Sequence, residues 1–257
     1  MKDQKGKVSV ITVCYNASET IENTILSVLN QSYDNYEYIV IDGNSSDETL
    51  SIINKYSNKI TKIVSESDKG IYDAMNKGIK LSTGEWLHFL NAGDRYADND
   101  VLSNIFKSGI EDNVNVLFSD YYTKREDGAI VRFCVDIIHR PSFNHQSTIY
   151  RKKLHNEHGM YIVTPQIIIS DILFFYSIPT QEMQKTDTVI AFFDNGGVSS
   201  IGNWSLQQWL CADVVFRRRS FGNMLVTYYY RRLRDGIPYK VRKLVNSTII
   251  WKKKSIS

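Results

Sequence analysis

The amino-acid sequence predicts an α/β fold in which a mostly parallel β-sheet is flanked by helices. Across the first hundred residues, short β-branched apolar runs alternate with segments whose apolar residues recur at helical spacing. Such alternation forms right-handed βαβ units, which place successive strands parallel to one another. The chain has 257 residues, of which 42% are hydrophobic, so it is long enough to bury one substantial core.

The first strand and the first helix have clear patterns. Residues 8–13 form a β-branched run typical of a buried strand. Ser18 is expected to cap the helix that follows. The apolar face of that helix consists of Ile21, Ile25, Val28 and Leu29. Further strands are expected at 36–41, 59–65 and 86–90, with helices at 50–53 and 71–79 between them.

After Asp94 the alternation becomes irregular. We expect a helix at 101–106, strands at 114–118, 130–135, 146–150 and 186–193, and a strongly apolar segment at 167–178. Residues 203–251 are rich in Trp, Tyr and Arg and are expected to be helical in pieces. The sequence therefore predicts a main domain at 1–202 and a basic, helical C-terminal extension at 203–257.

The net charge of +3 is unevenly distributed. Residues 217–254 contain twelve Lys and Arg residues and one acid, Asp235, so this segment carries +11 and the rest of the chain carries −8. An acidic body with a basic extension indicates two partners of different charge. A nucleic-acid-binding protein would need basic and aromatic residues interleaved on the body as well. We therefore rank that class last and expect no nucleic-acid partner.

The cysteines and apolar runs indicate a cellular compartment. Cys14, Cys134 and Cys211 are few, odd in number and far apart, which fits neither a disulfide framework nor a metal-binding pair. We therefore expect a reducing cytoplasm. The first apolar run is too short for a signal peptide, and no run of about 18 apolar residues is present to span a bilayer.

The polar segments after the first four expected strands are candidates for a binding site, because ligands of open parallel sheets bind beyond the carboxyl ends of the strands. These segments are 14–16, 42–44, 66–70 and 91–94, and three of them carry a carboxylate. The first turn lacks the glycines with which a dinucleotide-binding turn holds a pyrophosphate. A divalent cation on carboxylate oxygens could neutralise a bound diphosphate instead, since Mg²⁺ and Mn²⁺ favour such ligands.

Four ordered pieces of the sequence resemble the inverting glycosyltransferase family 2, which has the GT-A fold. They read ITVCYN at 11–16, IDGNSSDET at 41–49, DKGIYDAMNKG at 68–78 and GEWLHFLNAGD at 84–94. One piece alone would be a weak signal, but four in order at the family's separations form a strong one. The resemblance implies a nucleotide-sugar-binding half at about 1–97 and an acceptor half at about 98–202.

The resemblance also implies roles for single residues. The donor nucleotide would be bound by Tyr15, Asp42, Asp68, Lys69 and Asn76, with Tyr15 against the base. Asp94 occupies the last position of the family's acidic metal-binding motif. Because that motif holds one carboxylate here, we expect the diphosphate to supply most ligands of the Mn²⁺ or Mg²⁺. The plainer alternatives are turn residues at Asp42 and Asp94 and a loop-closing lysine at 69.

A weaker match continues into the second half. NHQS at 144–147 resembles the family's acceptor-side segment, so His145 and Gln146 are expected acceptor contacts. ISDI at 169–172 resembles the segment that supplies the catalytic base, which would be Asp171. Its apolar surroundings would raise the pKa of this carboxyl and suit it to a general base. The alternatives are a structural histidine at 145 and a helix that carries Asp171 into solvent.

The sequence thus predicts an inverting glycosyltransferase. It would move a sugar from a nucleoside-diphosphate sugar, UDP-linked in our prediction, to a hydroxyl of a glycan or polyprenyl-linked acceptor in bacterial surface polysaccharide biosynthesis. Asp171 would take the acceptor proton, and a metal near Asp94 would stabilise the departing diphosphate. The alternative is a nucleotide-sugar-binding protein of the same fold with weak or no activity, which the thinned acidic motif favours.

The basic extension bears on the acceptor. Its basic clusters at 217–219, 231–232 and 252–254 lie beside aromatic and aliphatic residues. This composition is typical of an interfacial helix on an anionic membrane surface. We therefore expect a cytoplasmic protein that is peripheral on the inner face of the cell membrane. The alternative is a basic helix that packs its apolar side on the acidic body.

Overall fold

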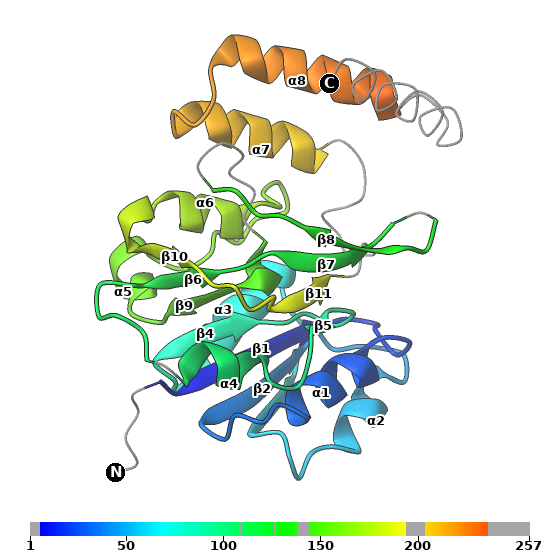
Figure 1. Ribbon diagram of the computed structural model, residues 1–257. Helices are drawn as coiled ribbons and strands as arrows, with labels where there is room; N and C mark the ends of the chain where they lie inside the picture. The colour runs from blue at the N-terminus through cyan, green and yellow to red at the C-terminus, as the bar shows by residue number, and fades with distance from the viewer. Residues whose placement is uncertain (1–5, 108, 126, 138–143, 194–203, 236–257) are drawn as a thin grey trace. The chain divides into compact units, whose positions relative to one another are not determined.

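The computed structural model describes residues 6–107, 109–125, 127–137, 144–193 and 204–235 (Figure 1). These residues belong to two compact units, one within 1–201 and one within 202–257. The first unit contains two β-sheets and their helices. The second contains α7 (Trp204–Val215) and α8 (Phe221–Asp235). The predicted α/β class is therefore confirmed.

The main sheet has seven strands in the order β10-β6-β9-β4-β1-β2-β3. Their bounds are β1 (Val8–Cys14), β2 (Tyr36–Asp42), β3 (Lys62–Ser65), β4 (Trp86–Phe89), β6 (Val116–Phe118), β9 (Thr148–Arg151) and β10 (Met183–Lys185). Strands β1 to β4 are parallel, whereas β9 runs antiparallel between β4 and β6. The strand order reverses at β1, which has β2 on one side and β4 on the other. A ligand is expected where the carboxyl ends of β1 and β4 meet.

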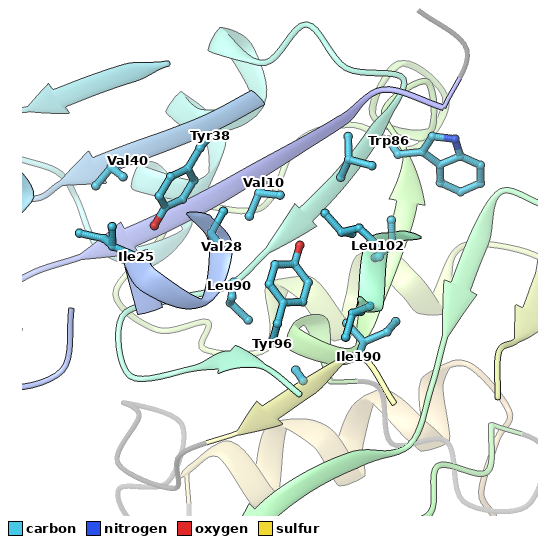
Figure 2. Packing of buried hydrophobic residues seen from close by; sticks show 14 of the residues in the cluster. Val10, Ile25, Val28, Tyr38, Val40, Trp86, Leu90, Tyr96, Leu102 and Ile190 are labelled. Atoms are coloured by element: carbon cyan, nitrogen blue, oxygen red, sulfur yellow. The ribbon is translucent and has the colours of Figure 1, made fainter. Parts of the chain in front are cut away.

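Helices cover both faces of this sheet. They are α1 (Ile21–Leu29), α2 (Thr49–Asn54), α3 (Ile71–Leu81) and α4 (Val101–Phe106). Figure 2 shows one face, where Val10 and Tyr38 of the sheet, and Leu90 just after β4, pack with residues of α1 and α4. On the other face, a Cβ on Gly78 would lie 2.5 Å from Ile11 Cγ2, so glycine allows α3 to approach β1. β1 is buried on both faces, and the hydroxyls of its two polar residues, Ser9 and Thr12, are hydrogen-bonded within the protein.

The second sheet was not separated from the first by the sequence pattern. Its strands, in spatial order, are β5 (Arg95–Tyr96), β11 (Ala191–Phe193), β7 (Tyr121–Lys124) and β8 (Ile130–Phe133). The remaining short elements are η1 (His145–Ser147), α5 (Leu154–His158), α6 (Ser170–Tyr176) and η2 (Thr180–Glu182). The 3-10 helix η1 replaces the beginning of the strand that we expected at 146–150.

The predicted cap of α1 was wrong. The residue before the helix is Thr20, and it makes no side-chain capping bond. Ser18 lies in the preceding turn, where its backbone N–H donates to Asp47 Oδ2 at 3.1 Å. A turn closed by Thr20 N–H on the carbonyl of Ala17, at 3.0 Å, therefore separates Ser18 from the helix.

Glu37 on β2 forms a buried polar network away from the strand ends that carry the candidate site. Its carboxylate accepts from Ser9 Oγ at 2.6 Å, Thr83 Oγ1 at 2.8 Å and Lys7 Nζ at 3.2 Å. Burial by itself raises the pKa of this carboxyl, but the hydrogen bonds outweigh burial and bring the pKa to about 2. Glu37 thus stays ionised and ties β1 to β2 and to the turn before β4.

The helical unit has its own packing. Asp213 of α7 is fully buried and accepts from Arg219 Nε at 3.0 Å. The guanidinium groups of Arg219 and Arg231 lie 5.6 and 5.1 Å from the Trp209 ring centre. Gln207 Nε2 donates to Tyr228 Oη at 3.0 Å. One face of α8 therefore packs on α7. No helix in the described part of the chain is both long and apolar enough to span a bilayer.

Candidate functional site

Tyr15 and Asp68 meet at Gly43, on the loop after β2. A Cβ on Gly43 would lie 2.5 Å from Asp68 Oδ2 and 3.4 Å from Tyr15 Cδ2. The Tyr15 side chain is 64% exposed. Asp68 Oδ1 accepts from the backbone N–H of Gly70 at 2.9 Å, which orients the carboxylate. An exposed aromatic ring and a carboxylate oxygen beside one glycine are groups that can bind a base and a ribose.

Asp42 lies behind this group at the end of β2. Its carboxylate is fully buried and accepts from Ser65 Oγ at 2.6 Å and from both the hydroxyl and the backbone N–H of Ser45. Burial, and then the negative charge of Asp42, raise the pKa of the neighbouring Cys14 thiol. Asp42 therefore fixes the loop after β2, and its own oxygens do not face solvent.

Lys69 lies just before α3, and Asn76 lies on the buried face of that helix. The backbone N–H of Lys69 donates to Asp73 Oδ2 at 3.0 Å, so Asp73 closes the loop before the helix. Asn76 Nδ2 donates to the carbonyl of Tyr161 at 2.8 Å, and Asn76 Oδ1 accepts from Tyr161 N–H at 3.1 Å. Both ends of the Asn76 amide are bonded to the backbone of Tyr161, which ties α3 to that segment, and the nucleotide contact that the resemblance implied stays a prediction.

Asp94 lies at the end of the loop after β4. It is 4% exposed, and its Oδ2 accepts from Gln146 Nε2 at 2.9 Å. The carbonyl of Gln146 contacts His88 Nε2 at 2.9 Å. Burial lowers the pKa of His88 to about 4, so this ring is neutral near pH 7. Gln146 itself is buried and its side chain is bonded to Asp94, and the acceptor contact that we expected of it stays a prediction.

Asp171 is held on both carboxylate oxygens. Tyr72 Oη donates to Oδ1 at 2.7 Å, and His145 Nδ1 lies 2.7 Å from Oδ2. The residue is 8% exposed, so the alternative of a solvent-facing helix position was wrong. Burial raises the pKa of Asp171. The hydrogen bonds from His145 and Tyr72 lower it by more, so the pKa lies below its ordinary value. The raised pKa expected from the sequence is therefore corrected.

The loop after β4, which contains Asp94, is the expected site of a divalent cation. Among the described residues, no three His, Cys, Asp or Glu side chains lie close enough together to hold a metal by themselves. Asn91, however, presents a buried amide oxygen that has no hydrogen-bond partner, in the same loop as the Asp94 carboxylate. Amide and carboxylate oxygens suit Mg²⁺ and Mn²⁺, which commonly take further ligands from a substrate phosphate. The residues present thus fit a cation shared with a diphosphate.

Sequence reasoning missed Tyr72 and Asn91 as members of this group. Tyr72 lies within the DKGIYDAMNKG piece, but its partner comes from α6, far along the chain. Asn91 opens the NAGD piece, where only the acid was singled out. Its Nδ2 lies 2.9 Å from His145 Nε2. The signal that could have identified them is that both are polar residues within the family's sequence motifs.

The chain belongs to glycosyl transferase family 2, because the sequence model of that family matches residues 9–170. The match spans the loops after β1, β2, β3 and β4 and ends beside Asp171. The family assignment made from the four sequence pieces is therefore confirmed.

Curated relatives carry names from cell-surface glycan biosynthesis. The PGL/p-HBAD biosynthesis glycosyltransferase of Mycobacterium bovis is 30% identical over 162 residues, which cover 60% of this chain and 62% of that protein. TuaG of Bacillus subtilis, named for teichuronic acid biosynthesis, is 33% identical over 131 residues, which cover 50% of this chain and 52% of TuaG. The chain therefore matches less than two thirds of the length of these relatives.

Solved structures share the fold. Residues 1–349 of S. aureus TarS, in complex with UDP-GlcNAc, align with a TM-score of 0.66 at 19% identity, covering 82% of this chain and 65% of that one. The mannosyltransferase PcManGT from Pyrobaculum calidifontis, in complex with GDP-Man and Mn²⁺, aligns with a TM-score of 0.58 at 17% identity, covering 94% and 68%. At these identities the likeness shows the fold, and the predicted GT-A fold is confirmed.

Proposed function

We propose that this protein is an inverting glycosyltransferase that moves a sugar from a nucleoside-diphosphate sugar to an acceptor hydroxyl. One observation carries the proposal. Asp94 and Asp171 come from distant parts of the chain, yet they are joined through consecutive residues: Gln146 bonds Asp94, and His145 bonds Asp171. A carboxylate for the donor side and a carboxylate for the acceptor side therefore belong to one connected group, as a single displacement between two substrates needs.

Asp171 is the proposed general base. Its lowered pKa keeps it ionised at neutral pH, which is the form that accepts a proton. Each carboxylate oxygen has two lone pairs, so an acceptor hydroxyl can still donate to an oxygen that already binds Tyr72 or His145. The hydroxyl oxygen attacks the anomeric carbon as its proton passes to Asp171, and the sugar–phosphate bond breaks. A single displacement of this kind inverts the anomeric centre.

The donor nucleotide is proposed to lie against Tyr15 and Asp68, next to the Gly43 backbone. We propose UDP, since TarS, which has the higher TM-score of the two structures described above, was solved with UDP-GlcNAc. A cation held by Asp94 and Asn91 Oδ1 would supply Lewis-acid stabilisation of the diphosphate. Lys69, which is exposed in the loop just before α3, is proposed as a phosphate contact.

The acceptor is proposed to be a growing surface glycan on a polyprenyl or other lipid carrier, in line with the names of the relatives. The outer face of α8 supports a location at the membrane. Its exposed apolar and aromatic side chains recur at helical spacing at Val226, Tyr229, Tyr230 and Leu233. Together with the neighbouring arginines, this face suits an anionic cytoplasmic leaflet.

Co-sedimentation with vesicles tests the membrane proposal. The full chain should bind vesicles that contain phosphatidylglycerol and lose binding at high salt, because each Arg or Lys near the surface contributes about 1 kcal/mol. Val226→Ser with Leu233→Ser should weaken binding, while Thr227→Ser on the face toward α7 serves as the matched control. Equal binding by all variants, or binding that ignores salt, would exclude this face as the anchor.

The second candidate is a protein that binds a nucleotide sugar without transferring it, which the single carboxylate in the NAGD piece favours. Calorimetry with UDP and GDP, each with and without Mn²⁺, identifies the nucleotide. Incubation with the matching nucleotide sugars and membrane lipid extract then measures release of the nucleoside diphosphate. Binding followed by release supports the transferase, and binding without any release supports the second candidate. If neither nucleotide binds, both are wrong.

A further inference from the structure

The ring of His145 bridges two segments that the proposed reaction uses for different substrates. Its Nδ1 lies 2.7 Å from Asp171 Oδ2, on the acceptor side. Its Nε2 lies 2.9 Å from Asn91 Nδ2, in the loop after β4 on the donor side. Both ring nitrogens are thus used within the chain, which leaves neither for the acceptor contact that the resemblance implied.

The direction of each hydrogen bond follows from the groups at its ends. An ionised carboxylate can only accept, so His145 Nδ1 carries the proton and donates to Asp171. In a neutral imidazole Nε2 is then an acceptor, and Asn91 must turn its NH₂ group toward it. The amide oxygen of Asn91 is left buried and without a partner. A buried oxygen in that state is costly until a ligand satisfies it.

The ring has little freedom to change this arrangement. Asn144 Oδ1 accepts from the backbone N–H of Gln146 at 3.0 Å and so fixes the 3-10 turn that carries His145. The Gln146 side chain, bonded to Asp94, anchors the same turn to the loop after β4. On the other side Tyr72 holds the second oxygen of Asp171. The orientation of Asn91 is therefore set by the same contacts that orient Asp171.

We propose that His145 is a positioning residue that couples the base Asp171 to the donor-side residue Asn91. This inference rests on the proposed function. In the donor complex the Asn91 oxygen either accepts a hydrogen bond from a hydroxyl of the nucleotide sugar or ligates the cation on the diphosphate. Once that oxygen is bound, the amide cannot rotate, His145 keeps its Nδ1 proton on Asp171, and the base is oriented before the acceptor arrives.

Two substitutions separate the two ends of the ring. His145→Asn places an amide nitrogen near the position of Nδ1, which keeps a donor for Asp171 and removes the contact with Asn91. His145→Gln reaches the position of Nε2, which keeps an acceptor for Asn91 and removes the donor to Asp171. The readouts are the affinity for UDP and for GDP, each with and without Mn²⁺, by calorimetry, and kcat at saturating donor.

We expect the two variants to fail differently. His145→Asn should weaken nucleotide affinity about tenfold, as expected for one lost hydrogen bond, with the smaller effect on kcat. His145→Gln should keep the affinity and lower kcat at least about tenfold. Loss of affinity only in the presence of Mn²⁺ assigns the Asn91 oxygen to the cation, and loss without metal assigns it to a hydroxyl of the nucleotide. A change in acceptor KM alone, in both variants, would overturn the proposal.

A second measurement on the unaltered chain remains decisive if the variants do not fold. Nitrogen NMR of the five histidines should show His145 with the proton on Nδ1, and adding the nucleotide with Mn²⁺ should shift its Nε2 signal. A proton on Nε2 would overturn the proposal. If neither UDP nor GDP binds the unaltered chain, the proposed function fails, and this failure is distinct because the protonated nitrogen is still observed.

Discussion

Tyr72→Phe removes one of the two side-chain hydrogen bonds that hold the carboxylate of Asp171. The lost bond, from Tyr72 Oη to Oδ1 at 2.7 Å, stabilises the ionised carboxylate. A hydrogen bond to a charged group contributes about 1.5–3 kcal/mol, and one pKa unit corresponds to about 1.4 kcal/mol. The pKa of Asp171 should therefore rise when this bond is lost. The ring itself stays, so packing against Tyr161, at 5.7 Å between centroids, is kept.

The pH dependence of kcat measures this shift. Protonation of Asp171 removes the base, so activity falls on the acid side of the profile. Because the pKa of Asp171 lies below its ordinary value in the natural chain, its acid limb should lie at low pH. In Tyr72→Phe the limb should move to higher pH, while activity near neutral pH is reduced only by the poorer orientation of the base.

Tyr56→Phe is the matched control. It removes a hydroxyl that donates to Glu22 Oε1 at 2.7 Å, between α2 and α1. Its acid limb should coincide with that of the natural chain. An acid limb that is unchanged in Tyr72→Phe, in a protein with unchanged thermal stability, would refute the assignment of Asp171 as the titrating base.

Three further predictions concern other parts of the site and the fold. Gly43→Ala should weaken nucleotide binding measured by calorimetry, because the added Cβ would lie 2.5 Å from Asp68 Oδ2 and displace that carboxylate. Asp94→Ala should lower kcat on the order of a hundredfold or more without loss of secondary structure, since a group that stabilises developing phosphate charge is removed; full activity in the presence of a chelator would contradict this. Glu37→Gln should lower the free energy of unfolding by up to about 3 kcal/mol at pH 7, since the folded pKa is depressed from 4.5 to about 2. That stability is complete above pH 4.5 and is lost as the pH falls toward 2, so urea unfolding of the variant and of the natural chain should converge at low pH.

The donor side could be predicted because its residues lie in short local motifs. Tyr15 and Asp68 each follow a strand of a regular βαβ series, and parallel strands bring their carboxyl ends together. The same reasoning located Asp94. In residues 8–90 the apolar residues recur regularly enough to identify every strand and helix. The residue at the N-cap position of α1, however, is Thr20 and not Ser18.

The acceptor side could be predicted only in part, because its contacts depend on pairings that sequence spacing does not encode. The segment 145–147 reaches the loop after β4 because β9 inserts antiparallel between β4 and β6. Strands of two or three residues, such as β5 and β10, have no measurable period. The pKa of Asp171 was expected to rise since its apolar neighbours are visible in the sequence, whereas the donors that lower it, Tyr72 and His145, come from α3 and η1.

Asp171→Asn tests the proposed chemistry most directly. The asparagine keeps the shape of the side chain and an oxygen that accepts from His145, but it cannot take a proton. Donor affinity measured by calorimetry should remain within about twofold of the natural chain, while turnover per bound donor falls at least about a hundredfold. Turnover per bound donor that is unchanged, together with lost donor affinity, would place Asp171 in the donor site and contradict its role as the base.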